Sequence, residues 1–205
     1  DRRAQLEAIR KIKFALPNGF TGSAAATNTV CPQVDADAGN CDDATLVGTV
    51  SAAVGSGPET YSVTGKIFNT QAPANRPAKL TSVIPVIVGP YDLGKIITPV
   101  DTTLDNNTFA LTAETGNLPL VHEGILVRIR QIQIDLVGYA TQNTPSTLDD
   151  EPFMTNPHQC GTHDVNADVT SSRPQTVTAT STISIDNASC PTQFNPGPVL
   201  TVDNA

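Results

Sequence analysis

The amino-acid sequence predicts an all-β fold: a disulfide-stapled β-sandwich, Ig-like or jelly-roll-like, formed by residues 1–205 as a single domain. Three observations predict this class. Short runs of alternating apolar and polar residues recur along the chain and are separated by Gly, Pro, Asn and Asp. Aromatic residues make up only 4% and Trp is absent, so the core must be built from aliphatic side chains, many of them β-branched. Four cysteines provide an even set for disulfides.

The N-terminal segment carries two periodicities. Apolar residues fall at helical spacing over residues 4–13, whereas Ile12, Phe14 and Leu16 alternate with Lys and Ala. We expect a strand that begins near residue 11, with a short helix before it as the alternative reading. The Pro-Asn-Gly sequence at 17–19 ends this strand.

The next segments predict a loop, a hairpin and an interrupted strand. Residues 22–43 are small and polar, which indicates a loop. Residues 45–54 and 60–68 are strand-like and are separated by Gly-Ser-Gly-Pro, so they predict a hairpin. Residues 78–88 form a long apolar run. Because Pro85 lies inside it, the run is expected to be an edge strand or to contain a bulge.

The middle of the chain contains the clearest strand. Residues 96–100 include a short apolar piece, 105–107 predict a turn and 108–113 predict a strand. Residues 125–137 alternate strictly until the apolar set changes face at Ile132. A change of phase by one residue predicts a β-bulge at this point.

A second hairpin is expected over residues 164–170 and 176–185, which both alternate. One face of its first strand carries three polar residues about 7 Å apart, Asp164, Asn166 and Asp168. This spacing is too wide for one ion, so we interpret them as an exposed polar face.

The cysteines favour sequential pairing, Cys31 with Cys41 and Cys160 with Cys190, since each pair flanks its own loop or hairpin. Four cysteines allow three connectivities, and the sequence does not choose among them. Their even number in a Thr-, Asn- and Pro-rich chain predicts an oxidising compartment, and hence a secreted, extracellular or cell-surface protein.

The net charge of the chain disfavours some classes of binding partner. The chain carries a formal charge of −8, which disfavours nucleic acid and anionic membranes as ligands. Its apolar runs are all shorter than the roughly 18 residues of a membrane-spanning helix, so no membrane span is expected.

No cofactor is expected, and the alternative is Ca²⁺. The acidic loop contains four carboxylates beside a glycine, an arrangement that suits a hard cation: Asp35, Asp37, Asp42 and Asp43. The simpler interpretation is a solvated, turn-forming loop. A second candidate metal site is a zinc site formed by His158, Cys160 and His163. A structural zinc site needs four ligands and no fourth is evident, and Cys160 has Cys190 as a candidate disulfide partner.

Catalytic signatures are not evident in the sequence. There is no G-x-S-x-G motif, and His122-Glu123 and His163-Asp164 are neighbours on expected strands, so they point to opposite faces. We therefore predict that the chain is not an enzyme. Tyr61, Tyr91 and Tyr139 are too few to predict an aromatic platform for sugars.

Several short motifs together resemble a module of large, mostly uncharacterised secreted surface proteins of actinobacteria. They are IKFALPNG at 12–19, Cys31 and Cys41 followed by LVGTV at 46–50, KIFN at 66–69, FMTNP at 153–157 leading to Cys160, and Cys190-Pro191 followed by FNP at 194–196. The resemblance implies an extracellular β-rich module with a structural or adhesive role, and it implies no catalytic residues.

These observations predict an extracellular structural protein whose partners are copies of itself. We expect a pilus-like fibre or a surface layer that assembles by β-strand addition, with residues 1–15 and 199–205 as candidate intersubunit strands. The side chains expected to mediate assembly are Ile12, Phe14, Leu16, Val199, Leu200 and Val202. The alternative is an adhesin or carbohydrate-binding module that recognises surface glycans.

Overall fold

A computed structural model describes residues 8–23, 27, 29–55, 58–136, 153–157, 159–173 and 175–185. It confirms the all-β, disulfide-containing fold. The elements, in order along the chain, are β1 (Ile9–Ala15), β2 (Thr21–Gly22), α1 (Gln33–Ala38), the 3-10 helix η2 (Asp43–Thr45), β3 (Leu46–Val54), β4 (Tyr61–Thr70), β5 (Lys79–Val88), β6 (Tyr91–Leu104), β7 (Leu111–Thr115), β8 (Val121–His122), β9 (Ile125–Leu126), β10 (Ile129–Leu136), β11 (Met154–Thr155), β12 (Gly161–Ser171) and β13 (Thr176–Ile185).

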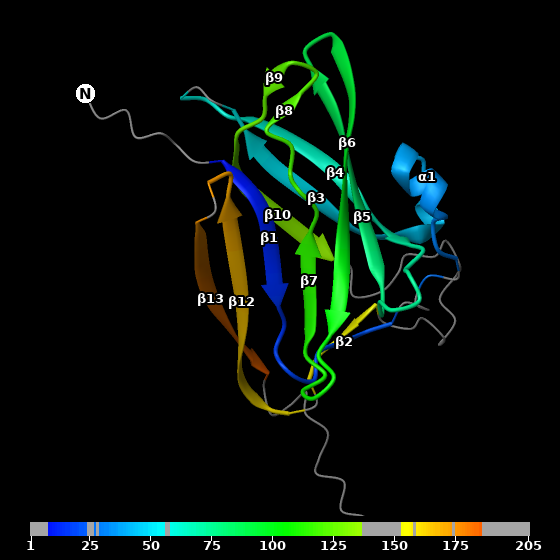
Figure 1. Cartoon of the computed structure of the whole chain (residues 1–205), viewed down its shortest axis with the longest axis vertical. Helices are drawn as coiled ribbons and strands as arrows, with labels where there is room; N and C mark the ends of the chain where they lie inside the picture. Colours follow the sequence, from blue (N-terminus) through cyan, green and yellow to red (C-terminus); the bar gives the residue numbers. More distant parts are fainter. Residues whose placement is uncertain are drawn as a thin grey trace, which may run out of the picture.

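One antiparallel sheet of nine strands dominates the described structure. Its order is β10-β3-β4-β5-β6-β7-β1-β12-β13. The sheet curls, so that β3, β4 and β10 cross behind β1 and β7 (Figure 1). The two layers expected of a sandwich are therefore supplied by one continuous sheet. Two small sheets, β2 with β11 and β8 with β9, lie beside it.

The curl encloses an aliphatic core. One cluster centres on Val47, Ile67 and Leu80, with Phe153 packed on it, and Ile132 contacts both this cluster and the next. The second cluster joins opposite parts of the sheet: it contains Ile12 of β1, Ile129 of β10 and Leu118, which lies between β7 and β8. Burying these side chains is the main favourable term for the fold, at about 25 cal/mol per Å² of apolar surface.

The segment that follows β7 connects β1 to the residues just before β10 through backbone hydrogen bonds. Leu118 N–H donates to the carbonyl of Arg10 at 2.8 Å, and Val127 N–H donates to the carbonyl of Leu120 at 2.8 Å. Leu118 itself is 7% exposed. The segment thus provides hydrogen-bond partners for backbone groups of Arg10 and Val127, while the Leu118 side chain fills the core.

Both predicted irregularities occur where the sequence places them. The β5–β6 register shifts between Pro85 and Ile87, so the bulge alternative is correct; β5 lies between β4 and β6 and is not an edge strand. The β10–β3 register shifts between Ile129 and Gln131, next to the predicted change of phase at Ile132. The hairpins β3–β4 and β12–β13 are also confirmed.

Three expectations differ from the structure. Residues 22–43 contain α1 and are not only a loop. Residues 96–100 belong to β6, a strand of 14 residues, and β7 begins at Leu111, not at 108. The segment 9–15 is a central strand, since β1 pairs with β7 on one side and β12 on the other.

The turn between β6 and β7 is organised by Asp105. Its Oδ1 accepts hydrogen bonds from Thr108 N–H (2.7 Å), Asn107 N–H (2.9 Å) and the Thr108 hydroxyl (3.0 Å). These bonds, first the one from Thr108 N–H, lower the pKa of the Asp105 carboxyl below its ordinary value of 3.8.

The lowered pKa of Asp105 predicts a pH-dependent contribution to stability. The folded state favours the carboxylate, so the contribution is present above the ordinary pKa and is lost as the pH falls through the lowered value. Asp105→Ala should therefore lower Tm at neutral pH, and the difference from wild type should shrink in acid. Thermal melts from about pH 2 to pH 7 test this. A Tm difference that does not vary with pH would contradict it, and Asp105→Asn serves as the control that keeps an acceptor oxygen.

Candidate functional site

The β12–β13 hairpin extends the sheet beyond the closed part of the curl (Figure 1). Its strands pair over ten consecutive positions, from Gly161↔Ile185 to Thr170↔Thr176, without a register shift. No strand of the described part of the chain pairs with the other side of β13. β13 therefore presents a long and regular edge.

The hydrogen-bonding alternation identifies which β13 backbone groups face this edge. At the hairpin end, Ser171 N–H donates to the carbonyl of Gln175 at 2.9 Å. In an antiparallel pair, bonded and non-bonded positions alternate. Counting from Gln175, the odd-numbered residues of β13 bond to β12. The N–H and C=O groups of Thr176, Thr178, Thr180, Thr182 and Ser184 therefore point outward.

Side-chain hydrogen bonds fix the two hairpin strands to each other. The hydroxyls of three threonines of β13 donate to β12: Thr178 to Asp168 Oδ1 (2.6 Å), Thr180 to Asn166 Oδ1 (2.7 Å) and Thr182 to Asp164 Oδ1 (2.8 Å). The predicted polar face thus exists and is occupied by cross-strand bonds. These bonds hold the edge in one register.

β13 lacks the features that usually protect an edge strand. Its sequence, TVTATSTISI, contains no charge, no proline and no glycine. The opposite end of the sheet differs, because β10 carries Arg130, Asp135 and the bulge near Gln131. Of the two sheet ends, β13 is therefore the less protected against pairing with a strand of another molecule.

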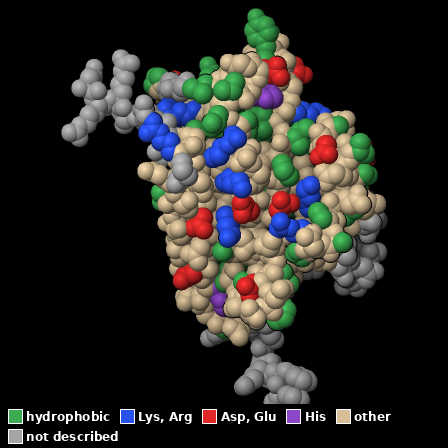
Figure 2. All heavy atoms as spheres, viewed as in Figure 1, with side chains coloured by type: hydrophobic (Ala, Val, Ile, Leu, Met, Phe, Trp, Pro, Cys, Tyr) green, Lys and Arg blue, Asp and Glu red, His purple; other side chains and the backbone are tan. Residues whose placement is uncertain are grey.

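The outer face of the sheet is charged, in contrast to the edge. Lys and Arg side chains are interspersed with Asp and Glu over the middle of the face in Figure 2. The register places Asp101, Glu114, Lys13 and Asp168 in one row across β6, β7, β1 and β12. Lys11 also forms an ion pair with Glu114 at 2.9 Å. Mixed charges of this kind keep the face solvated.

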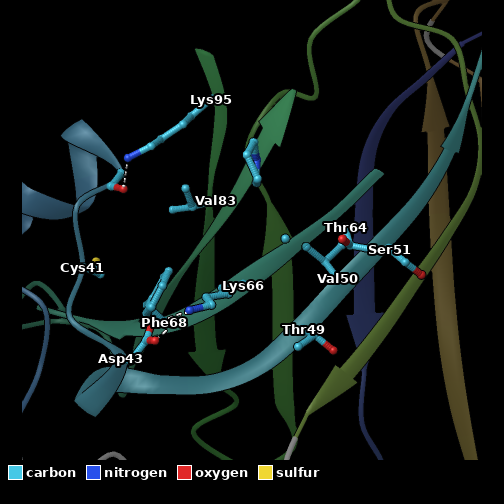
Figure 3. A pocket seen from close by; sticks show the side chains of 13 residues that line it. Cys41, Asp43, Thr49, Val50, Ser51, Thr64, Lys66, Phe68, Val83 and Lys95 are labelled. Carbon is cyan, nitrogen blue, oxygen red and sulfur yellow. Dashed lines mark hydrogen bonds and ion pairs between the residues drawn. The ribbon is translucent and has the colours of Figure 1, made fainter. Parts of the chain in front are cut away.

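A second candidate site lies beneath the disulfide loop. The Cys31–Cys41 bridge is confirmed, and the loop that it closes stands over the outer face of β4, β5 and β6. Between loop and sheet is a hollow of about 670 Å³ (Figure 3). Lys66 Nζ bonds both carboxylate oxygens of Asp43 at 2.7 Å, and Lys95 Nζ bonds the carbonyl of Gly39 at 2.8 Å and Asn40 Oδ1 at 2.9 Å.

The structure does not gather the four candidate calcium ligands. Asp35 and Asp37 lie on α1, where Gln33 donates to Asp37 at 2.6 Å. Asp42 caps η2 by accepting from Ala44 N–H at 2.7 Å, and Asp43 pairs with Lys66. Within the described ranges no group of three or more His, Cys, Asp or Glu side chains is placed to hold a metal.

The remaining predicted residues fall in different places. Ile12 is 5% exposed and belongs to the core, while Phe14 packs against that core. A strand in the position of β1 has no open edge, which differs from its expected role between subunits. Cys160 is disulfide-bonded. Cys190, together with Val199, Leu200 and Val202, lies outside the described residues.

The zinc alternative is not supported by what the structure describes. Cys160 is in a disulfide, and His163 Nε2 hydrogen-bonds the carbonyl of Gln159 at 2.8 Å. His158 lies outside the described residues.

No helix in the described ranges is long and apolar enough to cross a membrane. No family model, curated protein or solved structure matches the chain significantly.

Proposed function

We propose that this chain is an extracellular structural protein that associates with copies of itself by β-strand addition at β13, as the subunit of a fibre or surface layer. The observation that carries the proposal is the ten-residue, uncharged edge of β13, whose outer side pairs with no strand among the described residues. An added strand satisfies the outward backbone groups through main-chain hydrogen bonds. Because β13 carries no charge, two copies with a net charge of −8 can approach there without opposing like charges.

Thr180→Pro tests the association edge directly. Proline removes the outward N–H of Thr180, which an edge strand tolerates but an added strand requires. We expect wild type to associate with rising concentration in sedimentation experiments, and Thr180→Pro to associate at least about tenfold more weakly. Thr180→Ala is the matched control: it removes the hydroxyl bond to Asn166 but keeps the N–H, so it should associate like wild type.

The masses of the wild-type species in the same sedimentation experiments test the mode of assembly. Pairing of β13 with β13 is symmetric and stops at a dimer, whereas pairing of β13 with β10 is head-to-tail and propagates. A wild-type chain that stays monomeric at high concentration contradicts strand addition. A distribution that stops at the dimer contradicts the fibre and the surface layer.

A further inference from the structure

We infer that the hollow beneath the disulfide loop binds an acidic sugar, that is, a saccharide unit bearing one carboxylate. This inference does not depend on strand addition. It rests on three properties of the hollow: a prearranged wall, a hydroxyl-bearing floor and an excess of one positive charge.

The wall is held in place before any ligand arrives. The Cys31–Cys41 bridge closes the loop, and Lys66 and Lys95 attach it to the sheet (Figure 3). Gly39 ends α1 with φ +66°, and a Cβ added there would lie 3.2 Å from the Val83 side chain, so the end of the helix lies close to β5. A site whose walls are already ordered loses less entropy when a ligand binds.

The floor offers three hydroxyl groups from two neighbouring strands. Thr49 and Ser51 of β3 face the hollow with Thr64 of β4, which lies directly opposite Ser51. None of the three hydroxyls bonds a described residue. Neighbours across the strands lie about 5 Å apart and neighbours along a strand about 7 Å apart, so a ligand must be extended and rich in hydroxyls to reach all three. Inorganic phosphate is too compact to do so.

The charge of the hollow favours an acid over a neutral sugar. Lys66 and Lys95 contribute two positive charges and Asp43 one negative charge. Within the described ranges, no carboxylate lies within ion-pair distance of Lys95. Each ammonium group has three donors and uses two on the loop, so one donor of each is left for a ligand. In a chain of charge −8, this local excess selects a ligand with one negative charge.

Titration calorimetry of the full chain with a trisaccharide of one galacturonic acid unit and two galactose units tests the inference, with a neutral galactose trisaccharide and inorganic phosphate as comparison ligands. We expect saturable binding of the acidic sugar and at least about tenfold weaker binding of the neutral one, because hydrogen bonds to charged groups contribute more than neutral ones. Absence of binding to the acidic sugar, equal binding of both sugars, or phosphate binding at the same residues in place of the sugar would each overturn the inference.

Two variants locate the ligand. Thr64→Val removes a floor hydroxyl and keeps a β-branched side chain, and should weaken binding severalfold. Lys95→Met removes the unpaired charge and should weaken it about tenfold. Lys79→Met is the control, because Lys79 also holds the loop, through Gln33 Oε1 at 2.8 Å, but does not line the hollow. It should bind like wild type. Unchanged affinity in Thr64→Val and Lys95→Met would contradict this location, and neither result bears on the association of β13.

Discussion

Replacing Gly65 by alanine is expected to lower the free energy of unfolding by about 2–3 kcal/mol, the cost of forcing extra atoms into a close contact. An added Cβ at Gly65 would meet the carbonyl oxygen of Val83 and would lie 2.8 Å from Ile84 Cα. Both are backbone atoms of β5, which is paired on both sides and cannot move away freely. Urea denaturation of the variant measures the change.

Two other glycines calibrate this expectation. Gly22→Ala places its Cβ 3.5 Å from the nearest atom, an ordinary contact, and should change stability by less than about 0.5 kcal/mol. Gly48→Ala meets the carbonyl oxygen of Asp135 at 2.5 Å, but Asp135 lies on β10 at an end of the sheet, where the strand can shift. Its cost should lie between the other two. Equal stability of Gly65→Ala and Gly22→Ala would contradict the close β4–β5 approach.

Local patterns in the sequence predict the hairpins and bulges because they depend on neighbouring residues. The alternation over 164–170 and 176–185 assigns every side chain of the β12–β13 hairpin to a face. The change of face at Ile132 predicts the bulge in β10, since an extra residue returns the later apolar side chains to the inner face.

β6 is difficult to predict because threonines occupy inner positions. Thr98 and Thr102 are 5% and 4% exposed and alternate with the apolar inner residues Ile96 and Val100. Burial of Thr102 is possible because its hydroxyl bonds the backbone of Ala78 in both directions, at 2.5 and 3.0 Å. Hydroxyl groups at core positions interrupt the apolar period that would reveal the strand.

The candidate sites depend on contacts between distant residues, which the sequence pattern does not contain. β1 lies between β7 and β12, and β10 lies beside β3, so neither end of the sheet can be inferred from chain order. The six-residue α1 is too short to form by itself and is held by the disulfide and the lysines. Lys66 and Lys95 carry no sequence signal beyond alternation, because their partners lie 23 and 55 or more residues away.

Removal of the Cys31–Cys41 bridge in a Cys31→Ala/Cys41→Ala variant is expected to lower the free energy of unfolding by about 3 kcal/mol, since the bridge closes a loop of 10 residues in the unfolded chain. The native loop keeps other attachments: Cys31 N–H donates to Asn69 at 2.9 Å and its carbonyl accepts from Gln71 N–H at 3.0 Å. The folded chain should therefore retain its β-rich circular dichroism spectrum while its urea midpoint falls. A loss below about 1 kcal/mol would mean that the unfolded chain is already compact around this loop. Lys66→Met is the comparison: it removes only a solvent-exposed ion pair to the same loop and should cost no more than about 1 kcal/mol.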